Sequence, residues 1–171
     1  VGRDSEVAQV QALLDGGDTR LVTLTGPGGI GKTRLALAAA AAMEHEFAHG
    51  ACFVGLASVR DPELIPLAIV QALGLQQSGD RSAADLVEVA LRDRHLLLVL
   101  DNLEHVIEAA AGWTSELLDH CPRLTVLATS RIALQIGGEQ RFPVPPLALP
   151  DPTAIEASEP VAPGAAVELF V

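Results

Sequence analysis

Basic side chains are scarce in this sequence, and all but one of them are arginine. The 171 residues include 11 basic and 22 acidic residues, which gives a formal net charge of −11, and Lys32 is the only lysine. Nucleic-acid phosphates are bound by clustered lysine and arginine side chains. We therefore exclude this segment as a nucleic-acid contact and expect any such contact in a domain outside it.

The sequence also lacks the features of a membrane-spanning or exported chain. No run of about 18 uncharged apolar residues is present, and no signal-peptide pattern opens the chain. The two cysteines, Cys52 and Cys121, lie far apart in apolar surroundings, which predicts buried reduced thiols rather than a disulfide. We expect a cytoplasmic protein without membrane contact.

The apolar content, 49% of the residues, is enough for a hydrophobic core. The length fits one domain or slightly more, which folds without disulfide or metal staples. The chain begins at Val1 and ends inside a helix-like pattern at residues 165–170. We therefore expect it to be a piece of a longer protein.

A glycine-rich stretch lies between an apolar run, residues 21–25, and an alanine-rich helical run, residues 34–43. In the order strand, glycine-rich turn and helix, backbone N–H groups converge on a phosphate group. Lys32 is expected on the β- and γ-phosphates, where a compact point charge is needed, and the Thr33 hydroxyl is expected on Mg²⁺. This phosphate-binding loop consists of Gly26, Pro27, Gly28, Gly29, Ile30, Gly31, Lys32 and Thr33.

Apolar strands and helical segments alternate along the rest of the chain. Helices are expected between the strands, one running from the loop to Gly50 and one from about Leu103 to His120. The alternation predicts an α/β fold, the three-layer fold of a P-loop NTPase, with a mainly parallel central sheet of about five strands and helices on both faces. The expected strands cover residues 21–25, 51–56, 95–100, 124–128 and 140–144.

Ligands of an open parallel sheet lie at the carboxyl ends of its strands. Asp101 closes the most apolar strand and is placed to hold Mg²⁺ opposite the Thr33 hydroxyl, a position that also suits an N-cap for the next helix. The following Asn102 can orient a water but cannot take its proton, so that Glu104 is the candidate base. We expect slow hydrolysis, as in a switch that holds nucleotide rather than a motor.

Arg131 follows the next strand and is placed to contact a γ-phosphate, with Thr129 or Ser130 hydrogen-bonding nearby. The alternative interpretation is an ordinary surface arginine.

A separate pattern, from His45 to His49, matches the H-E-x-x-H zinc-protease motif. We interpret it as a solvated helix end, because the same helix serves phosphate at its other end.

The motifs in combination resemble the nucleotide-binding domain of STAND (NB-ARC-like) ATPases, closest to bacterial transcriptional regulators of the SARP/AfsR and large LuxR types. The resemblance covers roughly residues 1–147. It is carried by Val1-Gly2-Arg3, the loop GPGGIGKT, Leu97-Leu98-Val99-Leu100-Asp101-Asn102-Leu103-Glu104-His105, Cys121-Pro122 and Leu127-Ala128-Thr129-Ser130-Arg131.

The resemblance implies an ATP/ADP site with Mg²⁺ and a sensor role for Arg131. Gly2 and Arg3 would approach the adenine and ribose, and Arg34 and Pro146 would complete the nucleotide contacts. The prolines concentrated at the end of the chain predict a Pro-rich linker at residues 148–164. The resemblance further implies the start of a truncated helical domain at 165–171 and self-association of the full-length protein in its ATP-bound state.

Two other interpretations stay open at this stage. A P-loop small-molecule kinase or faster ATPase would share the loop but turn over quickly. A nucleotide-free scaffold would use the fold only for contacts, and the intact Lys32, Thr33 and Asp101 count against it.

Overall fold

The computed structural model of the chain describes residues 2–16, 19–76 and 80–146. The predicted linker at 148–164 and the predicted helical start at 165–171 lie outside these residues. The described helices and strands are, in chain order, α1 (Asp4–Leu14), β1 (Leu21–Thr25), α2 (Lys32–Met43), η1 (Glu44–Glu46), β2 (Ala51–Gly55), η2 (Pro62–Leu64), α3 (Ile65–Ala72), α4 (Ala83–Leu91), β3 (Leu96–Asp101), α5 (Ile107–His120), β4 (Leu124–Ser130) and β5 (Glu139–Pro143).

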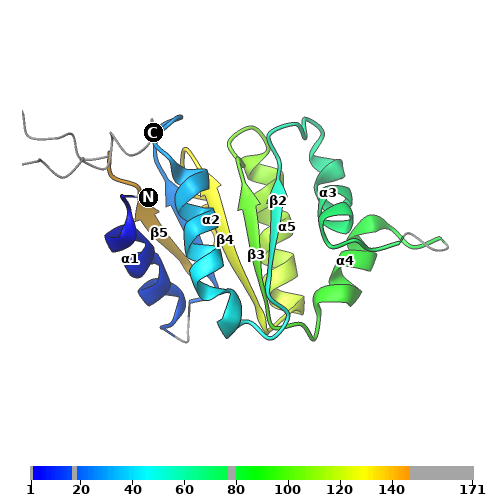
Figure 1. Cartoon of the computed structure of the whole chain (residues 1–171). Coiled ribbons are helices and arrows are strands. Elements are labelled where there is room, and N and C mark those ends of the chain that lie inside the picture. The colour runs from blue at the N-terminus through cyan, green and yellow to red at the C-terminus, as the bar shows by residue number, and fades with distance from the viewer. Residues whose placement is uncertain (1, 17–18, 77–79, 147–171) are drawn as a thin grey trace, which may run out of the picture.

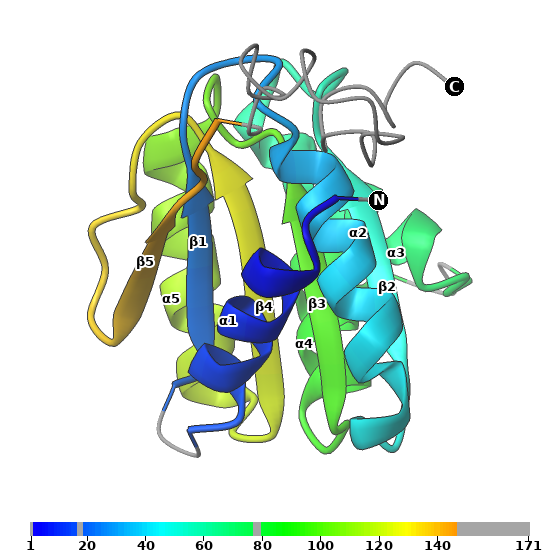
Figure 2. The same ribbon diagram turned by 60° about the vertical axis from the view of Figure 1, so that its left-hand side comes forward.

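The strands form one sheet in the order β2-β3-β4-β1-β5, and every pairing in it is parallel (Figure 1). Helices α1 and α2 cover one face of the sheet, whereas α3, α4 and α5 lie on the other (Figure 2). This three-layer α/β arrangement confirms the predicted fold class. The carboxyl ends of the strands meet at one edge, the upper edge in Figure 1.

Strand β3 shows why a strand of this fold is apolar throughout. Its even-numbered residues Leu96, Leu98 and Leu100 pack into the core beneath α3, α4 and α5. Its odd-numbered residues Leu97 and Val99 pack into the core beneath α1 and α2. Because both faces of the sheet are covered, neither set of alternate side chains meets water, and the run carries no polar residue before Asp101.

Two predicted helix boundaries are wrong, each because an apolar side chain leaves the helical path to reach a core. Helix α2 ends at Met43 rather than near Gly50, and after η1 the extended Phe47 turns its ring into the core. Helix α5 begins at Ile107 rather than Leu103, because Leu103 is itself fully buried ahead of the helix.

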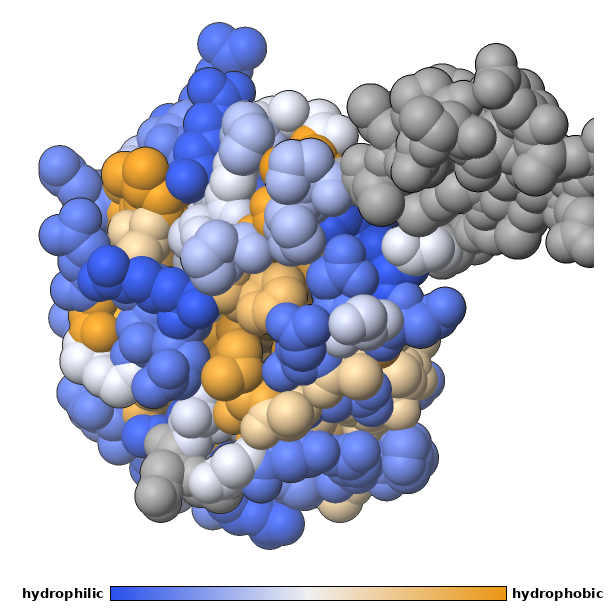
Figure 3. Space-filling view, turned by 90° about the vertical axis from the view of Figure 1, so that its left-hand side faces the viewer, coloured by the Kyte–Doolittle hydropathy of each residue, from blue (hydrophilic) through white to orange (hydrophobic). Residues whose placement is uncertain are grey.

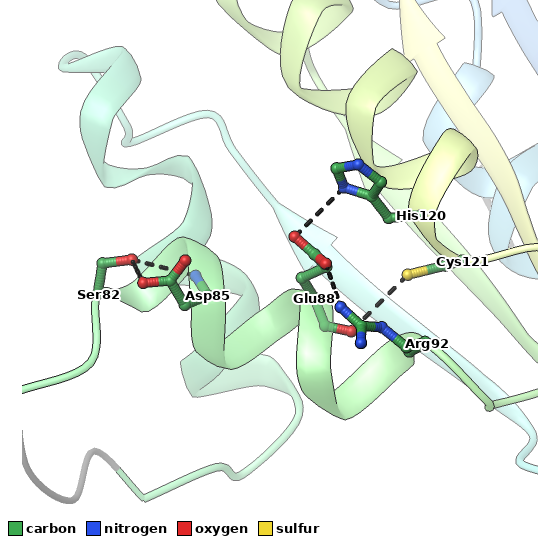
Figure 4. Close-up of polar contacts among 6 residues, drawn as sticks. All are labelled: Ser82, Asp85, Glu88, Arg92, His120 and Cys121. Atoms are coloured by element: carbon green, nitrogen blue, oxygen red, sulfur yellow. Dashed lines mark hydrogen bonds and ion pairs between the residues drawn. The ribbon is translucent and has the colours of Figure 1, made fainter.

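Helix α4 is capped by the side chain of Ser82, the residue before its first turn. The Ser82 hydroxyl accepts the Asp85 amide N–H at 3.1 Å and donates to the Asp85 carboxylate at 2.7 Å (Figure 4). Farther along α4, Glu88 pairs with Arg92 and with His120 of α5, and its carbonyl accepts the thiol of Cys121 (Figure 4). These contacts tie α4 to the end of α5.

In the described part of the chain, no helix is both long and apolar enough to cross a bilayer.

Candidate functional site

The glycine-rich loop joins the end of β1 to the start of α2. Gly29 and Gly31 have φ of 78° and 94°, the left-handed region that a residue with a Cβ adopts only at a cost. Gly31 is also the N-cap of α2, and no side chain caps that helix end. The first N–H groups of α2 therefore face the loop without a side-chain partner, which is the arrangement that binds a phosphate.

Lys32 lies in the first turn of α2 and curls back over the loop. Its ammonium group donates to the carbonyl oxygens of Gly26 at 2.8 Å and Pro27 at 3.1 Å, and only 8% of the residue is exposed. Neutral carbonyls are weaker partners for an ammonium group than phosphate oxygens. The only lysine of the chain is thus held where an incoming phosphate competes for it.

Asp101, at the end of β3, joins two neighbouring elements through one carboxylate oxygen. Its Oδ1 accepts the hydroxyl of Thr33 at 2.8 Å and the hydroxyl of Thr129 at 2.6 Å. Thr33 belongs to α2 and Thr129 to β4. A hydroxyl and a carboxylate side by side form a set of hard oxygen donors, which fits Mg²⁺.

Thr129 also holds the backbone that follows Asp101. Its hydroxyl accepts the Asn102 N–H at 2.9 Å, and its carbonyl accepts the Leu103 N–H at 3.0 Å. Asn102 has φ of 68°, a left-handed conformation that short polar side chains tolerate. The strain of this turn is therefore balanced by bonds from a threonine that is almost fully buried.

The sequence predicted a hydrogen-bonding residue at Thr129 or Ser130 but did not predict this role for Thr129. The only signal was a hydroxyl residue at a strand end beside Arg131. Sequence spacing contains no information that β4 lies next to β3 in register, and that register brings Thr129 to Asp101.

Arg131 lies between the loop and Glu104. Its Nε is 3.4 Å from Glu104 Oε1, and a Cβ placed on Gly28 would be 3.7 Å from its Nη2. The structure thus brings Arg131 and Glu104 together over the loop. The Arg131 side chain is 65% exposed and that of Glu104 17% exposed.

The guanidinium of Arg3 is held by backbone carbonyls of two other segments. It donates to the carbonyl of Ile30 at 2.7 Å and to that of Pro145 at 3.0 Å, and it pairs with Glu6 at 3.4 Å. Only 7% of Arg3 is exposed. It ties the phosphate-binding loop to the segment after β5, whereas the neighbouring Pro146 is exposed. The contact with adenine and ribose that the resemblance implied for Arg3 stays a prediction.

A pocket of about 340 Å³ lies where α1, α2 and the loop meet. Arg3 and the exposed Arg34 contribute polar atoms to its wall, and Val7 and Leu37 contribute apolar surface. Figure 3 views this side of the molecule and shows apolar surface near the centre of the face, surrounded by hydrophilic residues. A cavity of mixed polarity beside a phosphate-binding loop has room for a base or a sugar.

A larger pocket, of about 410 Å³, lies at the opposite edge of the sheet. Its wall includes Arg20, His95 and Arg123, which directly precede β1, β3 and β4. It is therefore remote from the loop and from Asp101. Although this pocket is larger, its position excludes it as the phosphate-binding site.

The zinc-protease pattern is not on one helix. His45 lies in η1, beyond the end of α2, and His49 lies farther on, where its ring accepts the His95 N–H at 3.1 Å. Two histidines can bind one zinc ion at this spacing only when a continuous helix places both on one face. Within residues 2–16, 19–76 and 80–146, no group of three or more His, Cys, Asp or Glu side chains is arranged for a metal.

Two solved structures with similar folds are those of a signal-transduction ATPase and of a protein in complex with ADPNP and ADP. The STAND protein with a tetratricopeptide repeat sensor from Pyrococcus horikoshii has a TM-score of 0.56 at 17% identity, over 84% of this chain and 23% of that one. The ORC2 protein of Aeropyrum pernix, described in ADPNP and ADP complexes, has a TM-score of 0.54 at 23% identity, over 75% and 41%. At such identities the likeness establishes the fold alone.

Comparison of sequences finds relatives with higher sequence identity than these structures. An uncharacterized protein of Mycobacterium tuberculosis (strain H37Rv), Rv0894, is 45% identical over 149 residues, which are 87% of this chain and 37% of that protein. The "Putative HTH-type transcriptional regulator Rv0890c" of the same strain is 42% identical over 132 residues, 77% of this chain and 15% of that protein. The chain thus spans well under half the length of these relatives.

The NB-ARC domain matches residues 3–136, from Arg3 through the loop, Asp101 and Arg131 to the turn before β5. This range contains four of the five strands and the helices on both faces. The chain therefore belongs to the NB-ARC domain family and is a nucleotide-binding P-loop domain.

Proposed function

We propose that this chain is an ATP/ADP-operated switch within a bacterial transcriptional regulator. The observation that carries the proposal is the 2.8 Å hydrogen bond from Thr33 Oγ1 to Asp101 Oδ1, which joins the phosphate-binding loop to the end of β3. A phosphate site alone would accept many anions. A hydroxyl and a carboxylate beside it are suited to a phosphate that arrives with Mg²⁺.

Thr33 and Asp101 are the residues that would hold Mg²⁺, Thr33 through its hydroxyl and Asp101 directly or through water. When bound, the ion neutralises charge on the β- and γ-phosphates. Lys32 would exchange the carbonyls of Gly26 and Pro27 for phosphate oxygens, and the N–H groups at the start of α2 would bind the same anion. The base and ribose would occupy the pocket between α1 and α2.

Hydrolysis by this site is slow in our proposal. Asn102, in the position directly after Asp101, has an amide that cannot accept a proton from water. Its backbone is also held in a left-handed turn by Thr129, so that the position is rigid. A site that positions a triphosphate without a strong base beside it stores the nucleotide rather than spending it, which suits a switch.

The regulator role is supported by the relative with the HTH-type name and by the charge of this chain. A formal net charge of −11 makes the segment itself a poor DNA ligand, so that DNA contact belongs to another part of the full-length protein. We place that protein in the cytoplasm. ATP binding would open the full-length protein for self-association.

Nucleotide content and affinity test the proposal. The purified 171-residue chain is denatured and any released nucleotide is identified by ion-exchange chromatography, and we expect ADP. Calorimetric titration with ADP and ATP, with Mg²⁺ or with EDTA, is then expected to show tighter binding with Mg²⁺. A chain that retains no nucleotide and binds none would support the scaffold interpretation instead.

Two further measurements separate the remaining alternatives. Lys32→Ala is expected to abolish nucleotide binding, whereas Arg123→Ala, which changes an exposed arginine at the opposite edge of the sheet, leaves it unchanged. Tight binding by Lys32→Ala would refute the loop assignment. Steady-state phosphate release is expected well below the about 1–100 s⁻¹ of kinases, and a rate within that range would favour the kinase or faster ATPase.

A further inference from the structure

We propose that Glu104 sets the preference of the site between a nucleoside diphosphate and a triphosphate, by holding Arg131 as its counter-ion until a γ-phosphate competes for it. The inference rests on the proposed nucleotide function. It gives Glu104 a role in specificity, exerted through Arg131, in place of the role of a general base.

The first support is the position of the pair. Arg131 Nε lies 3.4 Å from Glu104 Oε1, while the other end of the guanidinium reaches the loop, 3.7 Å from where a Cβ on Gly28 would be. The Arg131 guanidinium therefore lies between the Glu104 carboxylate and the loop backbone that would surround the phosphates. A terminal phosphate and Glu104 are rival anions for the same guanidinium.

The second support is the unequal surroundings of the two carboxylate oxygens. Glu104 Oε2 is buried and has no hydrogen-bond partner among the described residues. Among the described residues, Arg131 is the cation that pairs with Glu104. If Arg131 moves away from Glu104, a carboxylate that is only 17% exposed is left without a counter-ion. The free-energy cost of that unpaired charge opposes the movement of Arg131.

The third support is that hydrogen bonds hold the segment around Glu104, whereas the Arg131 side chain is exposed and has room to change its conformation. Thr129 bonds the amides of Asn102 and Leu103 on one side of Glu104. On the other side, His105 Nε2 lies 3.0 Å from the carbonyl of Leu56. The Arg131 side chain, by contrast, is 65% exposed. The guanidinium therefore moves from the carboxylate to the phosphate, and the carboxylate does not follow.

The consequence is a bias towards the diphosphate state. ADP occupies the loop and leaves the pair between Glu104 and Arg131 intact. ATP gains a bond to Arg131 only by breaking that pair. A ligand shifts an equilibrium between two states only by the difference between its affinities for them. Here the two states are Arg131 paired with Glu104 and Arg131 released to the γ-phosphate, and Glu104 reduces the advantage that ATP gains from the second state.

The test compares affinities for ADP and for a β,γ-imido ATP analogue, both with Mg²⁺, by calorimetry on the 171-residue chain. Glu104→Gln keeps the shape of the side chain and removes its charge. We expect it to raise the affinity for the analogue relative to ADP by about threefold to fivefold. A change of this size corresponds to the loss of the interaction free energy of a partly exposed ion pair. Glu108→Gln, an exposed change in the first turn of α5, is the matched control and is expected to leave the ratio unchanged.

A double-mutant cycle assigns the effect to Arg131. In an Arg131→Gln background, Glu104→Gln is expected to leave the affinity ratio unchanged, because the pair is already absent. Glu104→Asp, which keeps the charge but shortens its reach, is expected to raise the ratio by less than Glu104→Gln. Thermal unfolding of each variant establishes that the ratios come from folded protein.

The outcomes separate this inference from the function on which it depends. A wild-type chain that binds neither nucleotide overturns both. A wild-type chain that binds both, with Glu104→Gln at the wild-type ratio, overturns the inference alone. A lowered ratio would mean that Glu104 delivers Arg131 to the phosphate, and it also overturns the inference. Unchanged affinities with loss of hydrolysis would make Glu104 the base.

Discussion

The hydroxyl of Thr129 donates to Asp101 Oδ1 at 2.6 Å, from a position at the end of β4 that is 1% exposed. The same oxygen of Thr129 accepts the Asn102 N–H. One hydroxyl therefore orients the carboxylate that would face Mg²⁺ and holds the strained turn that follows it. Its removal has consequences for both stability and binding.

Thr129→Val is expected to destabilise the fold by about 1–3 kcal/mol, because the half-buried amide of Asn102 and a buried carboxylate oxygen of Asp101 each lose a partner. Urea unfolding measures this change as a shift of the midpoint. We also expect the gain in nucleotide affinity from Mg²⁺ to shrink. Thr129→Ser keeps the hydroxyl and is expected to retain most of that gain; equal loss in both variants would contradict a role for the hydroxyl.

Arg3→Ala is expected to destabilise the fold by about 1–3 kcal/mol. The variant leaves the carbonyls of Ile30 and Pro145 without the charged donor that they share, and such bonds are stronger than neutral ones. Chemical denaturation checks this, with the exposed Arg60→Ala as control. If both variants unfold at the same urea concentration, Arg3 does not stabilise the link between the loop and the segment after β5.

Gly112→Ala is expected to stabilise the protein by up to about 1 kcal/mol. Gly112 lies inside α5, is exposed, and has open space where a Cβ would be, so that alanine gains helix propensity at no steric cost. Gly29→Ala is the contrasting variant. It also meets open space, but its φ of 78° makes it destabilising by about 1 kcal/mol. Thermal unfolding distinguishes the two signs.

Both thiols are expected to react slowly with thiol reagents in the folded protein. Burial raises the pKa of Cys52, and burial together with the nearby Glu88 raises the pKa of Cys121, so that less reactive thiolate is present at neutral pH. Colorimetric labelling with and without urea measures the difference. Rapid labelling of either cysteine in the native chain would contradict the buried positions.

The raised thiol pKa values also give a direction for stability. The folded chain holds the thiol protons more tightly than the unfolded chain, so this contribution is complete below the ordinary thiol pKa. It is lost as the pH rises through the raised values. Urea midpoints measured from neutral to alkaline pH are therefore expected to fall, and Cys52→Ala is expected to reduce the slope.

Local patterns were sufficient for the fold class and for the loop. The apolar run of β3 has no polar residue because both of its faces are covered, and this property can be read from consecutive residues. The residues from Gly26 to Thr33 likewise form one short loop and the start of α2, so residues that are close in the sequence are also close in space. The free, buried thiols of Cys52 and Cys121 confirm the prediction made from their apolar neighbours.

Local patterns were insufficient where a side chain leaves its own element. The ends of α2 and α5 depend on where Phe47 and Leu103 find space in a core, and helix propensity does not contain that information. Nor does sequence spacing show that Arg3 bonds to Pro145, 142 residues away along the chain.

The sequence by itself determined that this chain has a phosphate-binding loop followed by an acid at a strand end. Only the tertiary structure decided which side chains act on those two features. Parallel pairing of β3 with β4 brings Thr129 to Asp101, and the end of β4 carries Arg131 to Glu104 above Gly28. The physical reason is that strand register is set by the packing of both sheet faces, and a partner set by register has no fixed distance along the chain.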